Sequence, residues 1–307
     1  MSTRSATARS RVTIPALAER RRSGEPLVMV TAYDYPSALA AERAGVDLVL
    51  VGDSGAMTVL GYPDTTTVTV AEMLVLAAAV RRGLQTPLLV GDLPFGSYER
   101  SDPDAVDTAI RFVKEAGCDA VKLEGGGGMS VSRARAVVAA GIPVMGHVGL
   151  TPQTATALGG YRAQGRTADA AVRVLRQAEA LQEAGCFSVV LEAVPTEVAA
   201  QVTALLEIPV IGIGAGPRVD GQVLVFHDLL GIREGQGARF VRRYADLLDE
   251  MSDGVATFAA EVRSGQYPAA EHCYRMPATE LADFRDRLGT PQAQARIPVS
   301  MASTARQ

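Results

Sequence analysis

Eight short apolar runs alternate with alanine-rich segments along this chain, and the alternation restricts the possible folds more than any other feature. The runs occupy residues 26–32, 46–52, 87–91, 118–124, 142–149, 187–193, 208–216 and 222–228. The runs are rich in Val, Ile and Leu, whereas the segments between them carry Ala and Leu at helical spacing. The pattern predicts alternating strands and helices, and therefore a parallel sheet.

Ala-Gly pairs mark the ends of four predicted helices, at 44–45, 116–117, 140–141 and 184–185. Glycine readily takes the left-handed conformation that closes a helix, so each pair separates a helix from the strand that follows. After the eighth run, residues 238–265 have the spacing of one or two amphipathic helices.

Five of the apolar runs end in an acid or a histidine. These residues are Asp53, Asp92, Glu124, His147 and Glu192. An open doubly wound sheet would also alternate strand and helix, but it gathers its site around one switch point. A closed (β/α)8 TIM barrel instead brings every strand end to one mouth. We therefore predict a barrel at residues 21–275 with extra C-terminal helices, a flexible lead-in at 1–20 and a partly disordered extension at 276–307.

Composition disfavours nucleic acids and membranes as partners of this protein. The formal net charge is −4 and the pI is near 5.5, which disfavours a nucleic-acid or anionic membrane surface. No apolar stretch reaches the roughly 18 residues of a membrane span. The three cysteines are widely spaced and suggest a reducing, cytoplasmic setting, with Cys118 and Cys186 as buried structural thiols.

Three of the strand-end residues form an all-oxygen set. Asp53, Asp92 and Glu124 follow consecutive predicted strands, and carboxylates with water and substrate oxygens are the ligands that Mg²⁺ prefers. The alternative is that each acid caps a helix or pairs with a nearby base. Three acids at one mouth favour the metal site.

The remaining candidates suggest roles in substrate binding and proton transfer. Lys122 lies two residues before Glu124, faces the same side of its strand, and suits either a substrate carboxylate or an ion pair. Ser54 suits substrate binding or a turn cap. Glu192 is a candidate general base, and His147 would orient it, contact substrate or be structural. The small residues of 212–216 suit a phosphate or simply a close backbone approach.

Many ordered motifs resemble the ketopantoate hydroxymethyltransferase family. They include TAYDYPSA (31–38), VGDSGAMTVLGY (51–62), DLPFGSY (92–98), VKLEGG (121–126), GHVGLTPQ (146–153), GGYRAQGR (159–166), VLEAVP (190–195) and IPVIGIGAGPRVDGQVLVFHDLLG (208–231). The resemblance covers about residues 10–275. The segment PDTTTVT at 63–69 departs from the family pattern DTTLPVT, so the loop after the second strand is expected to influence which 2-oxo acid is accepted.

The resemblance implies a barrel of the phosphoenolpyruvate/pyruvate-like superfamily and a homodecamer. It implies that Asp53, Asp92 and Glu124 bind or orient Mg²⁺, that Ser54 and Lys122 contact the 2-oxo acid, and that Glu192 is the base with His147 in support. The implied reaction is attack of the metal-stabilised enolate of 3-methyl-2-oxobutanoate on the one-carbon unit of methylenetetrahydrofolate, giving 2-dehydropantoate.

Three alternatives to this activity remain open at the level of sequence. One is a relative that uses a different 2-oxo acid. Another is a Mg²⁺-dependent lyase or mutase of the phosphoenolpyruvate mutase and isocitrate lyase type, although no KKCGH-like motif occurs. The last is a ligand-binding scaffold without catalysis, although such a protein would be free to lose its acids.

Overall fold

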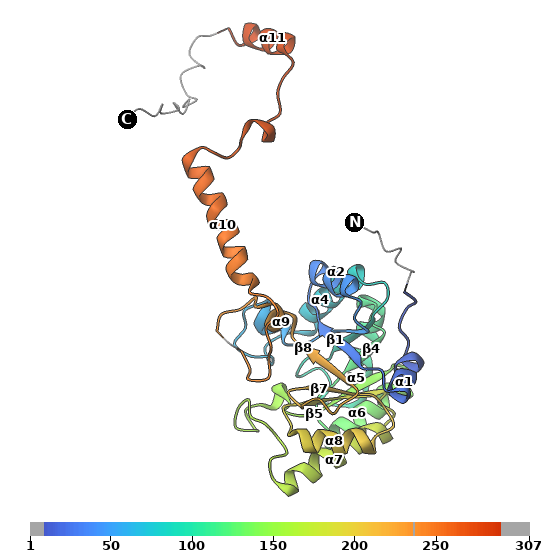
Figure 1. Ribbon diagram of the computed structural model, residues 1–307. Helices are drawn as coiled ribbons and strands as arrows, with labels where there is room; N and C mark the ends of the chain where they lie inside the picture. Colours follow the sequence, from blue (N-terminus) through green and yellow to red (C-terminus); the bar gives the residue numbers. More distant parts are fainter. Residues whose placement is uncertain (1–8, 236, 290–307) are drawn as a thin grey trace, which may run out of the picture. The chain divides into compact units, whose positions relative to one another are not determined.

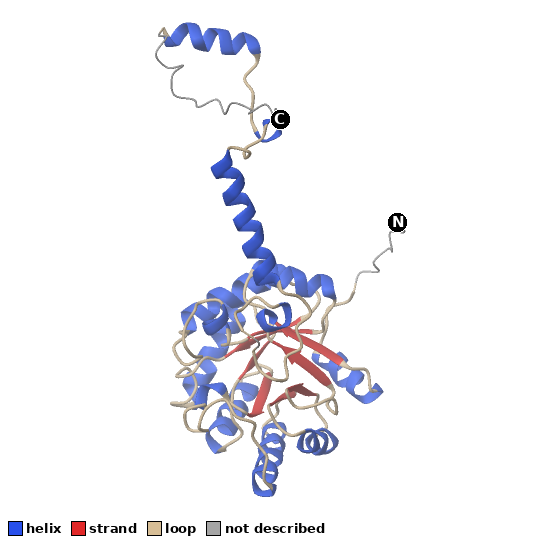
Figure 2. Cartoon of the chain, turned by 60° about the vertical axis from the view of Figure 1, so that its left-hand side comes forward, coloured by secondary structure: helices blue, strands red, loops and turns tan. Residues whose placement is uncertain are grey.

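Eight parallel strands close into a single barrel in the computed structural model, which describes residues 9–235 and 237–289. The strands are β1 (Leu27–Thr31), β2 (Leu48–Val51), β3 (Leu88–Asp92), β4 (Ala120–Lys122), β5 (Val144–Gly149), β6 (Ser188–Glu192), β7 (Val210–Ile213) and β8 (Gly221–Leu224). Each strand pairs with the next, and β8 returns to pair with β1. Figure 2 shows the strands inside a ring of helices, so the predicted barrel is confirmed.

Helices surround the strands, and those from α2 to α8 lie between one strand and the next along the chain (Figure 1). They are α1 (Ile14–Ser23), α2 (Tyr35–Ala44), α3 (Gly55–Thr58), α4 (Val70–Gly83), α5 (Asp102–Ala116), α6 (Gly128–Ala139), α7 (Ala168–Glu183), α8 (Thr196–Leu205) and α9 (Phe226–Leu230), with a 3₁₀ turn at Pro152–Thr154. The glycines of all four predicted Ala-Gly pairs have positive φ, between 71° and 96°, as the helix-end prediction requires.

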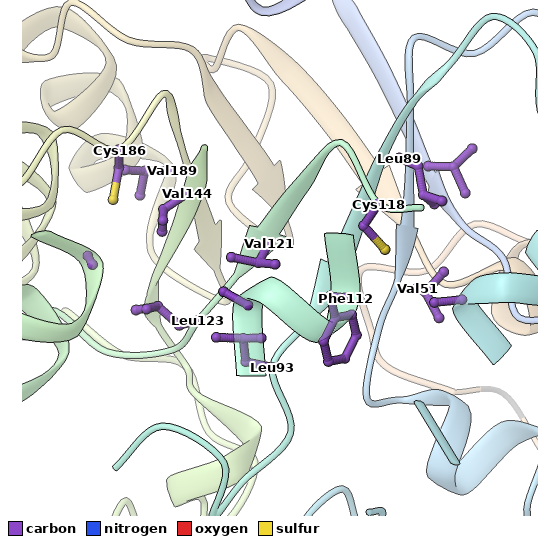
Figure 3. Packing of buried hydrophobic residues seen from close by; sticks show 14 of the residues in the cluster. Val51, Leu89, Leu93, Phe112, Cys118, Val121, Leu123, Val144, Cys186 and Val189 are labelled. Carbon is purple, nitrogen blue, oxygen red and sulfur yellow. The ribbon is translucent and has the colours of Figure 1, made fainter. Parts of the chain in front are cut away.

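Side chains alternate between two apolar layers because successive residues of a strand face opposite ways. In β2, Leu48 belongs to the cluster inside the barrel, whereas Val49 belongs to the larger cluster under the helices. Figure 3 shows part of that outer layer, with Phe112, Cys118 and Leu89 packed among its side chains. The predicted burial of Cys118 is confirmed, as is that of Cys186.

An ordered helix occupies part of the segment expected to be a flexible lead-in. Helix α1 begins at Ile14, inside the predicted range 1–20, because Thr13 caps its first turn and Leu17 is buried at 1% exposure. Arg20 also donates a hydrogen bond of 2.5 Å to Asp47, just before β2. Residues 1–8 lie outside the described part of the chain.

The chain divides into two compact units, 1–245 and 246–307, so the barrel unit ends earlier than the expected boundary at 275. Among the described residues of the first unit, the five-residue helix α9 is the one helix that follows β8. The second unit contains α10 (Leu247–Ser264), a 3₁₀ turn at Ala270–His272 and α11 (Ala278–Leu288). Residues 290–307 of the predicted extension are not among those described. No helix in the described ranges is long and apolar enough to cross a membrane.

Candidate active site

Charged side chains continue the inward-facing series of four neighbouring strands at their carboxyl ends. Asp92 follows Leu88 and Val90 at alternate positions of β3, and Lys122 follows Ala120 in β4. Glu124 lies two residues after Lys122, just beyond that strand. His147 of β5 and Glu192 of β6 likewise lie two residues after the inner-layer residues Met145 and Val190. The period of two that fills the barrel with apolar side chains therefore also aims these groups at its centre.

Asp53 and Asp92 form a pair of buried carboxylates. The backbone N–H of Asp53 donates a hydrogen bond of 3.1 Å to Asp92 Oδ2. Burial and the nearby carboxylates of Asp92 and Glu124 hold the pKa of Asp53 well above its ordinary value. Burial also raises the pKa of Asp92, against the opposing effect of Lys122. Because buried carboxylates repel one another, a cation bound beside them would stabilise their charged forms.

Lys122 supplies one cation to this cluster. Its Nζ lies 2.9 Å from Asp92 Oδ1 and 4.0 Å from Glu124 Oε1. Burial by itself would lower the pKa of Lys122, but the carboxylates of Asp92 and Glu124 outweigh it and raise the pKa above the ordinary lysine value. The side chain is therefore an ammonium ion that faces the cavity.

His147 lies between two carboxylates. Its Nε2 is 3.2 Å from Glu192 Oε2, and its Nδ1 is 3.5 Å from Glu124 Oε1. Nδ1 also lies 3.2 Å from Lys122 Nζ, a contact that would suit the neutral ring. Burial and Lys122 oppose protonation, but hydrogen bonds to Glu124 and Glu192 prevail and raise the pKa of His147 to about 9. The imidazolium form is therefore favoured, and its Nε2 holds the side chain of Glu192 in place.

Gln153 connects the acids, and the sequence analysis assigned it no role. It lies in the 3₁₀ turn after β5, where its backbone N–H donates to Glu124 Oε2 at 3.0 Å and its Nε2 donates to Asp53 Oδ2 at 2.9 Å. Its Oε1 accepts a 2.6 Å hydrogen bond from the hydroxyl of Tyr98, a second overlooked residue. Gln153 lies in the motif GHVGLTPQ and Tyr98 in the motif DLPFGSY. Membership of these motifs was the only feature of the sequence that could have indicated a role for either residue.

A cavity of about 230 Å³ is lined by the predicted residues Asp53, Ser54, Asp92, Lys122, Glu124, His147 and Glu192. We call it the inner cavity. Ser54 Oγ lies 2.8 Å from the hydroxyl of Tyr33. Thr65, from the loop that departs from the family pattern, also lines this cavity, and its buried hydroxyl has no hydrogen-bond partner among the described residues. The structure therefore brings all seven sequence candidates together.

Asp228 and Arg233 also line the inner cavity, where they form a 2.7 Å ion pair. The small residues of 212–216 leave room for protein side chains: a Cβ at Gly214 would lie 2.5 Å from Phe240 Cδ1, and one at Gly216 would lie 2.2 Å from Thr196 Oγ1. Close packing therefore accounts for both glycines.

The donor set fits a hard divalent cation. The described residues contain no group of three acid, histidine or cysteine side chains already arranged as metal ligands. Asp53 and Asp92 are nevertheless adjacent, buried and short of positive charge. Two carboxylates with water and substrate oxygens form a typical Mg²⁺ site.

Comparisons with known proteins place the chain among hydroxymethyltransferases. The family model described as ketopantoate hydroxymethyltransferase matches residues 11–270. Proteins named 3-methyl-2-oxobutanoate hydroxymethyltransferase are similar over most of the chain. One from Moorella thermoacetica is 52% identical, covering 87% of this chain and 99% of its own. The mitochondrial protein 1 of Arabidopsis thaliana is 51% identical, covering 91% and 82%.

Solved structures with the same barrel have other activities in their names. A phosphonopyruvate hydrolase in complex with oxalate and Mg²⁺ matches with a TM-score of 0.56 at 15% identity, covering 93% of this chain and 99% of that one. A 2,3-dimethylmalate lyase of the PEP mutase/isocitrate lyase superfamily matches with a TM-score of 0.55 at 16% identity, covering 90% and 99%. At these identities the likeness establishes the fold alone.

Proposed function

Because the chain belongs to the ketopantoate hydroxymethyltransferase family, we propose that it transfers a hydroxymethyl group to 3-methyl-2-oxobutanoate. The chain is an enzyme of the transferase class. The proposed donor is methylenetetrahydrofolate, and the overall reaction consumes one water and gives 2-dehydropantoate and tetrahydrofolate. This reaction belongs to pantothenate biosynthesis.

The inner cavity is the observation that supports this function most directly. Its volume of about 230 Å³ suits a small 2-oxo acid, and its wall offers a buried ammonium ion and a carboxylate held by an imidazolium. A 2-oxo acid needs the first group to bind its carboxylate and the second to remove a proton from C3. We assign the first role to Lys122 and the second to Glu192.

Asp53 and Asp92 are the proposed Mg²⁺ ligands. Glu124 was also predicted as a ligand, but its Oε2 accepts from the Gln153 backbone and its Oε1 faces His147 and Lys122. These contacts favour a role for Glu124 in orienting the site. A bound Mg²⁺ would stabilise negative charge on the oxygens of the 2-oxo acid and so make its C3–H more acidic.

Metal binding can be tested without turnover. Calorimetric titration of the full chain with Mg²⁺, at saturating 3-methyl-2-oxobutanoate, should show one site per chain. Asp92→Asn should abolish that heat. Equal Mg²⁺ affinity in Asp92→Asn and the wild type would refute this ligand assignment.

The protein residues divide the chemical work as follows. Lys122 pairs with the substrate carboxylate. The Thr65 hydroxyl, which has no partner among the described residues, donates to the substrate oxygens, and Ser54 donates to them while it accepts from Tyr33. Glu192 accepts the C3 proton, and the electron pair left on carbon attacks the one-carbon unit of the folate. His147 holds Glu192 in place through the 3.2 Å contact. Burial of the cluster strengthens each of these electrostatic interactions.

Product formation by the purified full chain tests the proposal. 2-Dehydropantoate should form only when 3-methyl-2-oxobutanoate, Mg²⁺ and methylenetetrahydrofolate are all present. No turnover by folded protein under these conditions would refute it. A panel of branched 2-oxo acids would identify another preferred substrate, whereas release of pyruvate or glyoxylate without folate would support the lyase alternative.

Two further proposals concern the setting of the enzyme. We place it in the cytoplasm because none of its three cysteines forms a disulfide. The homodecamer implied by the family resemblance stays a prediction. Light scattering should give the mass of ten 32.2 kDa chains, and a stable dimer or tetramer would refute it.

A further inference from the structure

A buried phenol lies directly behind one wall of the inner cavity. Tyr33 is 0% exposed, and its hydroxyl lies 2.8 Å from Ser54 Oγ. Ser54 lines the inner cavity, whereas Tyr33 does not. The phenol is therefore placed to act on a ligand in that cavity through the Ser54 hydroxyl.

The fold fixes the phenol in this position. Tyr33 follows β1, and its backbone N–H donates a hydrogen bond of 3.1 Å to Ser37 Oγ in the first turn of α2. A Cβ at Gly55 would lie 2.7 Å from Tyr33 Cδ1, so the phenol ring packs directly against the first residue of α3. The ring of His227 also contacts it, with centroids 5.4 Å apart and planes at 49°. These contacts hold the phenol hydroxyl beside Ser54.

The surroundings determine the direction of the hydrogen bond between Tyr33 and Ser54. Burial raises the pKa of Tyr33 to about 12, so the phenol keeps its proton near neutral pH. A buried hydroxyl proton without an acceptor is costly, and Ser54 Oγ at 2.8 Å is in position to accept it. Tyr33 then donates and Ser54 accepts, which leaves the proton of Ser54 for a ligand in the cavity.

Two other hydroxyls near the phenol, those of Thr31 and Thr58, already have partners. Thr58 Oγ1 donates a hydrogen bond of 3.1 Å to the carbonyl oxygen of Ser54. Thr31 Oγ1 accepts one of 2.8 Å from the backbone N–H of Phe226. Ser54 Oγ is therefore the acceptor that remains for the phenol proton.

We propose that Tyr33 is a positioning residue, whose phenol donates to Ser54 Oγ and thereby directs the Ser54 proton to an oxygen of the bound 2-oxo acid. The inference rests on the proposed function. A 2-oxo acid carries acceptors at its carboxylate and keto oxygens and a donor at neither. A Ser54 hydroxyl that donated to Tyr33 instead would present a lone pair to this anion, and the anion would bind more weakly.

The test is a double-mutant cycle on Tyr33 and Ser54. KM for 3-methyl-2-oxobutanoate is measured by exchange of its C3 proton with deuterated water, with Mg²⁺ and without folate. The full chain is compared with Tyr33→Phe, Ser54→Ala and the double variant. Tyr33→Phe should raise KM about fivefold, as expected for one neutral hydrogen bond, and should keep kcat for exchange within about twofold. In the Ser54→Ala background the same change should alter KM by less than about twofold, because the hydroxyl through which it acts is gone.

Tyr62→Phe is the matched control. The Tyr62 hydroxyl donates to Glu72 Oε1 at 2.5 Å, and neither residue lines the inner cavity. This variant loses a phenol hydrogen bond of the same kind and should keep the wild-type KM.

Three results would overturn the inference. They are an unchanged or lower KM in Tyr33→Phe, an equal rise in KM whether or not Ser54 is present, and loss of exchange by Tyr33→Phe at saturating 2-oxo acid. The last result would mean that the phenol supports the whole site rather than the Ser54 proton. A wild type that exchanges no C3 proton would instead refute the proposed function.

Discussion

Replacement of Gln153 by methionine tests how the acids are held in place. Methionine keeps the length of the side chain and the backbone N–H that serves Glu124, but it removes three hydrogen bonds. Two are neutral, to Leu93 O at 3.0 Å and from the Tyr98 hydroxyl at 2.6 Å, and one of 2.9 Å reaches the carboxylate of Asp53. At about 1 kcal/mol for each neutral bond and about 2 kcal/mol for the charged one, we expect a loss of about 4 kcal/mol in the free energy of unfolding.

The same change should impair the site. Without the Gln153 amide, the Asp53 carboxylate loses a donor that favours its charged form, so Mg²⁺ should bind more weakly and C3 proton exchange should slow by about tenfold or more. Urea unfolding followed by circular dichroism measures the first effect, and exchange followed by proton NMR measures the second.

Gln182→Met is the matched control. Gln182 Oε1 accepts from the backbone N–H groups of Glu207 and Ile208 at 2.6 and 3.3 Å, outside the cavity. Loss of these two neutral bonds should cost about 2 kcal/mol of stability and leave the exchange rate unchanged. If Gln153→Met exchanged the proton as fast as the control, the reasoning that the amide orients Asp53 would be wrong.

Three further predictions address the base, the packing and the thiols. Glu192→Gln should still bind the 2-oxo acid in calorimetry but should lose C3 proton exchange by at least about 10²-fold; exchange at the wild-type rate would remove the base assignment. Gly91→Ala should lower the free energy of unfolding by about 1–3 kcal/mol, because the new Cβ would lie 2.4 Å from Phe112 Cδ1; an unchanged urea midpoint would contradict this. At pH 8, Cys273 alone should react rapidly with a disulfide reagent, because burial raises the pKa of each of the other two thiols to about 12 and keeps them protonated; rapid reaction of all three thiols in the folded protein would count against it.

The barrel and the charged residues at its mouth could be predicted from the sequence because both depend on patterns between residues that are close together in the chain. A strand must be apolar where it is buried, so an interruption such as Asp92 or His147 stands out from its neighbours. Four of the five such interruptions then converged within about one hydrogen-bond length of a charged partner.

Residues that act through loops were harder to predict. Gln153 and Tyr98 lie in turns with no periodic pattern, and a polar residue there is ordinarily solvent-exposed. Their burial arises only because loops distant in the sequence meet above the barrel. Arg162, Arg166 and Arg239 likewise resemble ordinary surface charges in the sequence, because only the fold brings them to one cavity beside Glu192. Helix α1 was not predicted because it buries a single apolar side chain, that of Leu17, and ends in three consecutive arginines before Ser23.

A neighbouring cavity of about 820 Å³ shares Tyr161, Glu192 and Phe240 with the inner cavity, and this shared wall has a kinetic consequence. A ligand that fills the neighbouring cavity would cover one side of the inner one. The small 2-oxo acid should therefore enter first and the bulky donor second, while the spent donor should leave before the product. Initial-rate patterns would then be those of an ordered sequential mechanism, with tetrahydrofolate as the first product released.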